Sequence, residues 1–430
     1  MRRNVARTVT APLAPVAALF AHVAAAPQEE PPNARETEAL VEEFVGLRES
    51  VPKERAPRRD PRSASRSFRP LDAKAEVKWR KEIAKLWEKG PELEKKSGRH
   101  FLWEDDERGL YIVGGRTRNP KALLIGMHGG GAGSGDAGSA ASAYDSACSK
   151  LGWVGVFPEV LEKTEHGWTD SGTEEFVIEL AERARRTFGV DADHVFFSGH
   201  SMGGYGTWTL GGHHSDLVAA LAPSAGAPTP IMDRDGTFVD VIEGVVPNLR
   251  NVPMVIYQSG GDPNVPPEAN DVAVKKLGEA RERWGGYDFE YWRVEGRGHD
   301  LPPGGMEALL EKVASRSRAT HPDTIVWQPT LDWKRQMHWL FWEHPVPNAI
   351  VEARLDREAN TVRITADADT TGLWVLLDAG VLDLERDVVV EVGGKETFRG
   401  RAQPELAALV LTASTGDPGR TFVARVPVHP

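Results

Sequence analysis

The stretch FFSGHSMGGYGTW, residues 196–208, holds four glycines around Ser201. The apolar run HVFF (194–197) reads as a short buried strand, and we expect a helix to begin just beyond Ser201. Glycine weakens strands and helices alike, but it tolerates strained or crowded backbone. The pattern therefore predicts a sharp strand–turn–helix bend that exposes a serine hydroxyl at its apex, a nucleophile elbow.

Strands alternate with helices along residues 101–318 around this bend. The predicted strands are a hairpin in FLWEDDERGLYIV (101–113), then ALLIGM (122–127), WVGVFP (153–158), HVFF, VAALAP (218–223), VPMVIY (252–257) and YDFEYWRV (287–294). The predicted helices lie at about 139–150, 173–188, 267–284 and 304–317. Such alternation predicts the α/β class, with a doubly wound, mostly parallel sheet covered by helices on both faces.

A serine hydroxyl is a weak nucleophile that needs a general base and a group to orient that base. In folds with this elbow the partners follow along the chain as Asp or Glu and then His. Asp262 follows the strand VPMVIY, and His299 follows the strand YDFEYWRV. Ligand sites of open α/β sheets gather beyond such strand ends. We therefore predict Ser201 as nucleophile, His299 as base and Asp262 as acid, and we judge Asp300 too close to His299 in sequence to orient it.

The loop HGGGAGSGDAG after ALLIGM stands where the second oxyanion-hole donor is expected. We predict that Gly130 and Met202 supply the two backbone N–H groups. A phosphate cradle is the alternative, but the loop matches neither G-x-G-x-x-G before a helix nor G-x-x-x-x-G-K-S/T. The predicted substrate contacts are Gly129, Gly131, Trp168 and Tyr205.

The motifs HGGG, GHSMGGYGTW, GGDPNVPP and GRGH resemble those of the α/β-hydrolase superfamily over about residues 101–318. Within it they look most like polyhydroxybutyrate-depolymerase-like and feruloyl-esterase-like secreted esterases, and prolyl-oligopeptidase-type catalytic domains are similar too. The resemblance implies a Ser201–His299–Asp262 triad that cleaves carboxylic esters through an acyl-enzyme, without a cofactor. One departure is that many secreted esterases of this branch carry disulfides, whereas Cys148 is the only cysteine of this chain.

The chain before residue 101 predicts an export signal and a connecting region. MRRNVAR is basic, and TVTAPLAPVAALFAHVAAA is apolar and ends in small residues, so residues 1–26 are predicted to direct secretion or periplasmic export. A disordered, Ala-rich tail is the alternative. Residues 27–100 are predicted as a linker with helices over 36–47 and 72–96.

Residues 322–430 predict a separate, smaller β-sandwich-like domain. Its strand-like segments include TVRITADA, LWVLLD, DVVVEV, ETFRG and TFVARVPV, and Gly393–Gly394 is a plausible hairpin turn. The domain is expected to contact the catalytic domain or a polymer. We expect five of its aromatic residues to serve its core or the interdomain contact rather than a polymer; they are Trp327, Trp333, Trp339, Phe341 and Trp342.

The net charge of −11 argues against nucleic acid as a partner, and no later segment is apolar enough to span a membrane. His213 and His214 do not have metal-ligand spacing, so no metal is predicted. Two alternatives to an exported serine esterase remain. A prolyl-oligopeptidase-like peptidase would use the same residues, but the segment before residue 101 is short for its gating domain. A non-catalytic glycan-binding protein would normally have lost a triad member.

Overall fold

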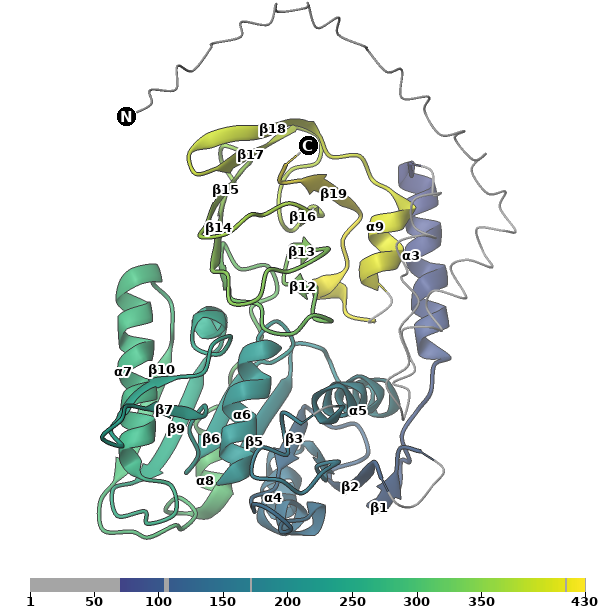
Figure 1. The fold of residues 1–430 in the computed structure, drawn as a ribbon. Helices are drawn as coiled ribbons and strands as arrows, with labels where there is room; N and C mark the ends of the chain where they lie inside the picture. Colours follow the sequence, from purple (N-terminus) through teal and green to yellow (C-terminus); the bar gives the residue numbers. More distant parts are fainter. Residues whose placement is uncertain (1–69, 104–107, 171, 414–415, 430) are drawn as a thin grey trace, which may run out of the picture.

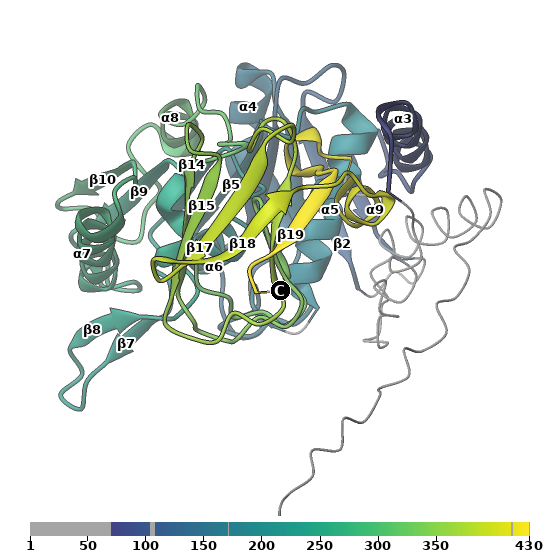
Figure 2. The same ribbon diagram turned by 90° about the horizontal axis from the view of Figure 1, so that it is seen from above.

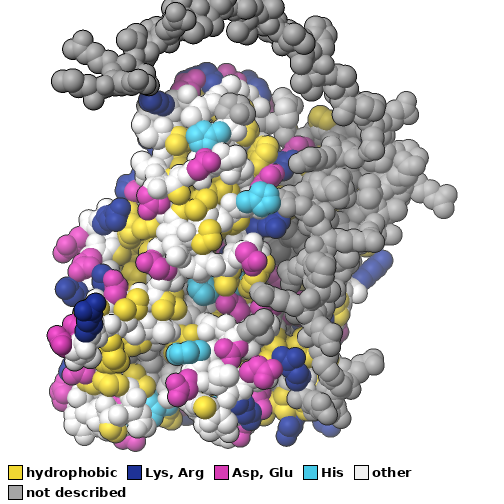
Figure 3. All heavy atoms as spheres, viewed as in Figure 1, with side chains coloured by type: hydrophobic (Ala, Val, Ile, Leu, Met, Phe, Trp, Pro, Cys, Tyr) yellow, Lys and Arg dark blue, Asp and Glu magenta, His cyan; other side chains and the backbone are white. Residues whose placement is uncertain are grey.

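The computed structural model describes residues 70–103, 108–170, 172–413 and 416–429. The predicted export signal and the helix expected over 36–47 lie outside the described residues. Figure 1 shows two domains, one stacked on the other, with the eight-stranded sheet and its helices forming the larger of the two. In the face drawn in Figure 3, acidic and basic side chains are interspersed.

The larger domain is built on a sheet with the strand order β1-β2-β4-β3-β5-β6-β9-β10. β1 and β2 form the predicted hairpin, β2 is antiparallel to β4, and the remaining neighbours are parallel. The bounds are β1 (Gly98–Phe101), β2 (Leu110–Gly115), β3 (Leu123–Met127), β4 (Val154–Pro158), β5 (Val195–His200), β6 (Ala220–Ser224), β9 (Met254–Ser259) and β10 (Phe289–Val294). The central strands are buried on both faces, which explains their continuous apolar runs.

Helices cover both faces of this sheet. α4 (Ala137–Leu151) and α8 (Gly305–Glu311) share one apolar core with it, and α5 (Thr173–Phe188), α6 (Met202–His213) and α7 (Pro267–Trp284) share another. Figure 2 shows the two groups on opposite sides of the sheet. The predicted doubly wound α/β architecture is confirmed. The last helix is shorter than expected and ends at Glu311.

A hairpin between β6 and β9 was not predicted. It consists of β7 (Pro230–Met232) and β8 (Phe238–Val241), and a 3₁₀ helix, η1 (Pro247–Asn251), follows it. The hairpin projects from the body of the domain (Figure 2). Its strands are three and four residues long and largely exposed, so they lack the buried apolar run that identified the other strands.

The smaller domain is confirmed as mainly antiparallel β-structure, with two sheets around one core. One sheet contains β11 (Thr324–Trp327), β14 (Val351–Asp356), β15 (Thr361–Ala366), β17 (Asp387–Val392) and β18 (Lys395–Arg401); the other contains β12 (Gln336–Met337), β13 (Leu340–Trp342), β16 (Leu373–Leu377) and β19 (Ala424–Pro427). Gly393 and Gly394 join β17 to β18 with φ of 56° and 78°, a turn that favours glycine. Trp327, Trp339 and Trp342 are buried in this core.

The smaller domain is formed by segments that lie before and after the larger domain in the sequence. α3 (Ala73–Glu88) packs beside α9 (Leu406–Ala413), as Figure 1 shows. Trp79 and Ile83 of α3 lie in the same core as the two sheets, and the N–H of Leu71 donates to the Pro404 carbonyl at 2.8 Å. The helix expected over 72–96 ends at Glu88, and it is a structural part of the smaller domain.

The smaller domain packs on the edge of the large sheet where the parallel strands begin. Asp216, in the turn before β6, forms ion pairs with Lys334 at 2.5 Å and Arg420 at 3.0 Å. Arg318 forms ion pairs with Asp193, which lies just before β5, and with Asp417. Ser201, Asp262 and His299 all follow the ends of their strands, so the smaller domain contacts the sheet edge opposite to them.

Candidate active site

The elbow has the strained geometry that the glycine pattern predicts. Ser201 lies between β5 and α6 with φ of 61° and ψ of −123°. Positive φ is costly for a residue with a side chain and persists only where the surroundings enforce it. In this elbow the Ser201 N–H donates to the Ser224 carbonyl at 2.9 Å, which ties the bend to the end of β6.

Close backbone packing explains the glycines of the elbow. A Cβ at Gly199 would lie 2.2 Å from the carbonyl oxygen of Gly203, and a Cβ at Gly203 would lie 2.2 Å from that of Met127. A Cβ at Gly204 would lie 2.5 Å from the carbonyl oxygen of Ser224. Any side chain at these positions would therefore force the two neighbouring strands and α6 apart.

The structure brings Asp262 and His299 together. The Nδ1 atom of His299 lies 2.8 Å from Oδ2 of Asp262, whose other oxygen accepts the N–H groups of Asn264 and Val265, each at 2.9 Å. The Asp262 carboxyl group is fully buried, whereas the His299 ring is 19% exposed. A buried carboxylate held at three points can fix the orientation and tautomer of the imidazole. No such bond connects Asp300 to His299 among the described residues.

His299 lies against the elbow through the residue that precedes the nucleophile. The rings of His299 and His200 are 4.8 Å apart between centroids, at 39° to each other. In the described part of the chain, no hydrogen bond links Ser201 Oγ to the His299 ring; catalytic hydrogen bonds are often long until substrate binds. The arrangement can supply a nucleophile, a base and an orienting acid from the carboxyl ends of β5, β9 and β10.

The HGGG loop lies directly beside Ser201. A Cβ on Gly129 would lie 3.2 Å from that of Ser201, and Gly130 has φ of 139°, a region that favours glycine. Among the described residues, the N–H groups of Gly130 and Met202 have no hydrogen-bond partner, as oxyanion donors require. The N–H of Gly131 instead donates to Ser134 Oγ at 3.0 Å, so it is not available to a substrate.

His128 fixes the orientation of this loop. Its Nδ1 lies 2.8 Å from the Gly129 carbonyl oxygen, and its Nε2 accepts the Val160 N–H at 3.2 Å. The indole N–H of Trp168 donates to the His128 carbonyl at 3.2 Å. Trp168 is fully buried, so it lies beneath the site and supports the loop rather than presenting a surface to a substrate.

Tyr205 lies one helical turn after Ser201, and its N–H donates to the Ser201 carbonyl at 3.1 Å. Its hydroxyl hydrogen-bonds to Thr169, and the exposed His166 ring approaches it edge-on at 5.5 Å. Tyr205 is only 9% exposed. Of the four predicted substrate contacts, Gly129 lies directly beside Ser201.

The adjacent histidines are part of the interior. His213 and His214 both lie within hydrogen-bond distance of one oxygen of the buried Glu174, at 2.8 and 2.9 Å. Burial would raise the pKa of the Glu174 carboxyl, but the two histidines lower it to about 2. Within the described residues, no group of His, Cys, Asp or Glu side chains is arranged to hold a metal ion. Of the helices described, none combines the length and apolar character that crossing a bilayer requires.

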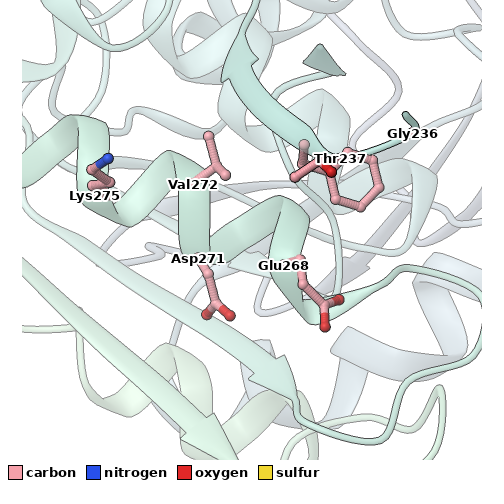
Figure 4. A pocket seen from close by; sticks show the side chains of 7 residues that line it. Gly236, Thr237, Glu268, Asp271, Val272 and Lys275 are labelled. Atoms are coloured by element: carbon pink, nitrogen blue, oxygen red, sulfur yellow. The ribbon is translucent and has the colours of Figure 1, made fainter. Parts of the chain in front are cut away.

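A hollow of about 510 Å³ lies away from these catalytic candidates, between the β7–β8 hairpin and α7. Figure 4 shows the side chains of Glu268, Asp271 and Lys275 on the α7 side and Thr237 on the hairpin side. None of Ser201, Asp262 and His299 lines it. A substrate in this hollow would therefore not lie against Ser201.

The sheet order, the elbow after β5, and Asp262 and His299 after β9 and β10 occur together in one domain. This domain has the α/β-hydrolase fold. No family model matches the chain. Over 168 residues it is 27% identical to the bifunctional acetylxylan esterase/xylanase XynS20E of Neocallimastix patriciarum, which covers 34% of this chain. The match spans about a quarter of that relative's length, 24%.

Solved structures of esterases are similar at lower sequence identity. An acetyl xylan esterase from Aspergillus awamori is 12% identical, with a TM-score of 0.38 over 50% of this chain and 98% of that one. A ferulic acid esterase from Anaeromyces mucronatus is 17% identical, with a TM-score of 0.37 over 51% of this chain and 89% of that one. The fold assignment rests on the chain's own sheet order and elbow.

Three residues of the candidate site were not predicted from the sequence: His128, His200 and Ser224. Histidine stands next to the glycines in both motifs, HGGG and GHSMGG, and this is the signal that points to His128 and His200. Ser224 has no comparable signal, because only the pairing of β5 with β6 brings it to the elbow.

Proposed function

We propose that this chain is a serine carboxylesterase in which Ser201 is the nucleophile, His299 the general base and Asp262 the orienting acid. The observation that carries the proposal is the 2.8 Å contact between His299 and the buried Asp262, beside a serine held at positive φ. These are the parts that acyl transfer through a serine requires.

In the proposed acylation step, Ser201 Oγ attacks the ester carbonyl while His299 Nε2 takes the hydroxyl proton. Asp262 accepts the hydrogen bond from Nδ1–H and stabilises the imidazolium that forms. The N–H groups of Gly130 and Met202 donate to the oxyanion. Collapse of the tetrahedral intermediate breaks the bond to the alcohol, which leaves with the proton from His299.

Deacylation repeats these steps with water as the nucleophile. His299 removes a proton from water, the hydroxide adds to the acyl carbonyl, and the same donors hold the second oxyanion. Collapse releases the carboxylic acid and returns the proton to Ser201 Oγ. No cofactor or metal takes part in the proposed cycle.

As substrates we propose acyl esters carried on a plant-type polysaccharide, with acetylated xylan as the first candidate. The partial match to an acetylxylan esterase/xylanase and the resemblance of GHSMGG and HGGG to feruloyl-esterase motifs support this choice. The peptidase alternative is less favoured because the smaller domain contacts the sheet edge opposite Ser201, where it cannot gate the site. Secretion or periplasmic export through residues 1–26 is part of the proposal, and amino-terminal sequencing of the exported protein tests it.

The test is hydrolysis of a panel comprising p-nitrophenyl esters, acetylated xylan, feruloyl sugars, a polyester and aminoacyl anilides. Ser201→Ala should lower turnover by roughly 10⁴-fold or more and abolish labelling by a fluorophosphonate probe, because triad members act as a unit. Circular dichroism of both proteins controls for folding. Normal labelling of the alanine variant would refute Ser201 as nucleophile, and cleavage of anilides alone would favour the peptidase.

A further inference from the structure

His200 occupies the position between β5 and the nucleophile, and its ring is oriented by neighbours on both sides. Its Nδ1 lies 2.9 Å from the hydroxyl oxygen of Ser224, at the end of β6. Its ring packs against that of His299, with 4.8 Å between the ring centroids. One side chain thus connects the elbow, the end of β6 and the loop that carries the base.

Ser224 contacts the elbow twice, through different groups. Its carbonyl accepts the N–H of Ser201, and its hydroxyl bonds to His200. The first contact fixes the nucleophile and the second fixes the ring against which His299 rests. Because the hydroxyl can be removed without changing the backbone, the two contacts can be separated experimentally.

The His200 ring is suited to this place because it is polar but uncharged. Burial, together with the neighbouring His299, lowers the pKa of His200 to about 4, although Asp262 and Asp300 favour its charged form. Near neutral pH the imidazolium that forms on His299 during attack therefore meets a neutral ring. A permanent cation at this position would repel it.

We propose that His200 is a positioning residue that holds the imidazole of His299 in reach of Ser201, and that the Ser224 hydroxyl in turn orients His200. The inference rests on the proposed function, since it concerns the base of that reaction. His200 acts on the chemistry through His299 and does not itself touch the reacting atoms. A displacement of the base by about 1 Å is enough to lower turnover on the order of 10²-fold.

Three substitutions at His200 separate its ring from its hydrogen bond. His200→Ala removes both, His200→Asn keeps a polar group near Ser224 without the ring, and His200→Phe keeps the ring without the bond. We expect kcat for an activated ester to fall roughly 10²-fold in the alanine and asparagine variants and roughly tenfold in His200→Phe and Ser224→Ala. KM should stay nearly unchanged. His194→Asn, just before β5 at its opposite end, is the matched control and should behave as wild type.

A double-mutant cycle with His299→Ala tests whether the effect passes through the base. In the His299→Ala background, His200→Ala should cause no further loss of kcat. An equal further loss there, or wild-type kcat in both His200→Ala and Ser224→Ala, would overturn the inference. The proposed function is judged separately, by whether Ser201→Ala abolishes wild-type hydrolysis, so its failure and that of the His200 role are distinguishable.

Discussion

At the scale of single residues, the site depends on which carboxylate faces His299. Asp262 is buried and accepts three hydrogen bonds, two of them from the backbone of its own loop. Asp300 is adjacent to His299 in the chain and exposed. An orienting acid has to approach Nδ1 end-on from another loop, and the contact of Asp262 with His299 meets that requirement.

Asp262→Asn should lower turnover by roughly 10²- to 10⁴-fold near neutral pH, because an amide at this position favours the wrong imidazole tautomer. Asp300→Asn is the matched control and should change turnover far less. The measurement is turnover of one activated ester by both variants at the same pH, with folding checked by circular dichroism. The reverse order of losses would mean that the loop of Asp262 is only structural.

The roles of site residues could be predicted from the sequence where the order of residues along the chain constrains them. The order of Ser201, Asp262 and His299, each after an apolar run, predicted the loops that the structure brings to one sheet edge. The roles of Trp168 and Gly131 could not be predicted from the sequence. Trp168 is buried, and the N–H of Gly131 donates to the Ser134 hydroxyl. Both depend on contacts with residues distant along the chain or on local turn geometry.

At the scale of elements, the hydrophobic pattern of the sequence predicted the helices and strands that bury apolar side chains in the core. The bounds of α7 are as expected, and β3 and β10 lie within the predicted apolar runs. β5 and β9 begin within theirs and continue to His200 and Ser259. The β7–β8 hairpin and α9 were missed, the first because it is short and exposed. The docking of α3 was missed because an apolar stripe shows that a helix packs but not what it packs against.

The docking of α3 predicts a specific dependence of stability. Ile83 is fully buried in the core of the smaller domain, whereas Val77 of the same helix is 68% exposed. Ile83→Ala should lower the free energy of unfolding of that domain by about 2–5 kcal/mol, since it leaves a cavity. Val77→Ala is the control and should change it by less than about 0.5 kcal/mol. Denaturant unfolding followed by tryptophan fluorescence measures both, and equal effects would contradict this packing.

At the scale of the whole molecule, the catalytic candidates and the smaller domain occupy opposite edges of one sheet. The elements that hold Ser201, Asp262 and His299 have their own cores on both faces of that sheet. The interface between the domains contains ion pairs around Asp216 and Arg318, and Val326 of β11 also packs into a core of the larger domain. Removing one partner of a buried ion pair destabilises the folded protein, because it leaves an uncompensated buried charge.

Truncation to residues 90–321 should therefore keep most of the activity on small soluble esters while lowering the melting temperature. Both parts of the smaller domain have to be removed, because deletion of 322–430 alone would expose Trp79 and Ile83 of α3. Turnover per folded molecule is the measurement, and the same truncation carrying Ser201→Ala is the control. A folded but inactive truncation would show that the smaller domain helps to build the site.

Buried histidines near the interface make stability depend on pH. Burial lowers the pKa of His338 to about 3 and that of His214 to about 4, the latter against the pull of Glu174. An unfolded chain titrates its histidines near pH 6.5. Between these values the unfolded state binds more protons than the folded state, so folding stability falls as the pH falls. The lowered pKa of Glu174 acts in the same direction below pH 4.5.

We therefore predict that the free energy of unfolding is lost progressively from about pH 6.5 downwards, on the order of 1.4 kcal/mol per pH unit for each such histidine. His338→Asn should reduce this slope, because it removes one of the linked protons. Asparagine is a suitable replacement, since His338 has φ of 50° and asparagine tolerates positive φ. Urea unfolding between pH 8 and 4 measures the slope for both proteins. A stability that does not change between pH 6.5 and 4, or an unchanged slope in His338→Asn, would show that His338 gains its proton in the folded state as readily as in the unfolded one.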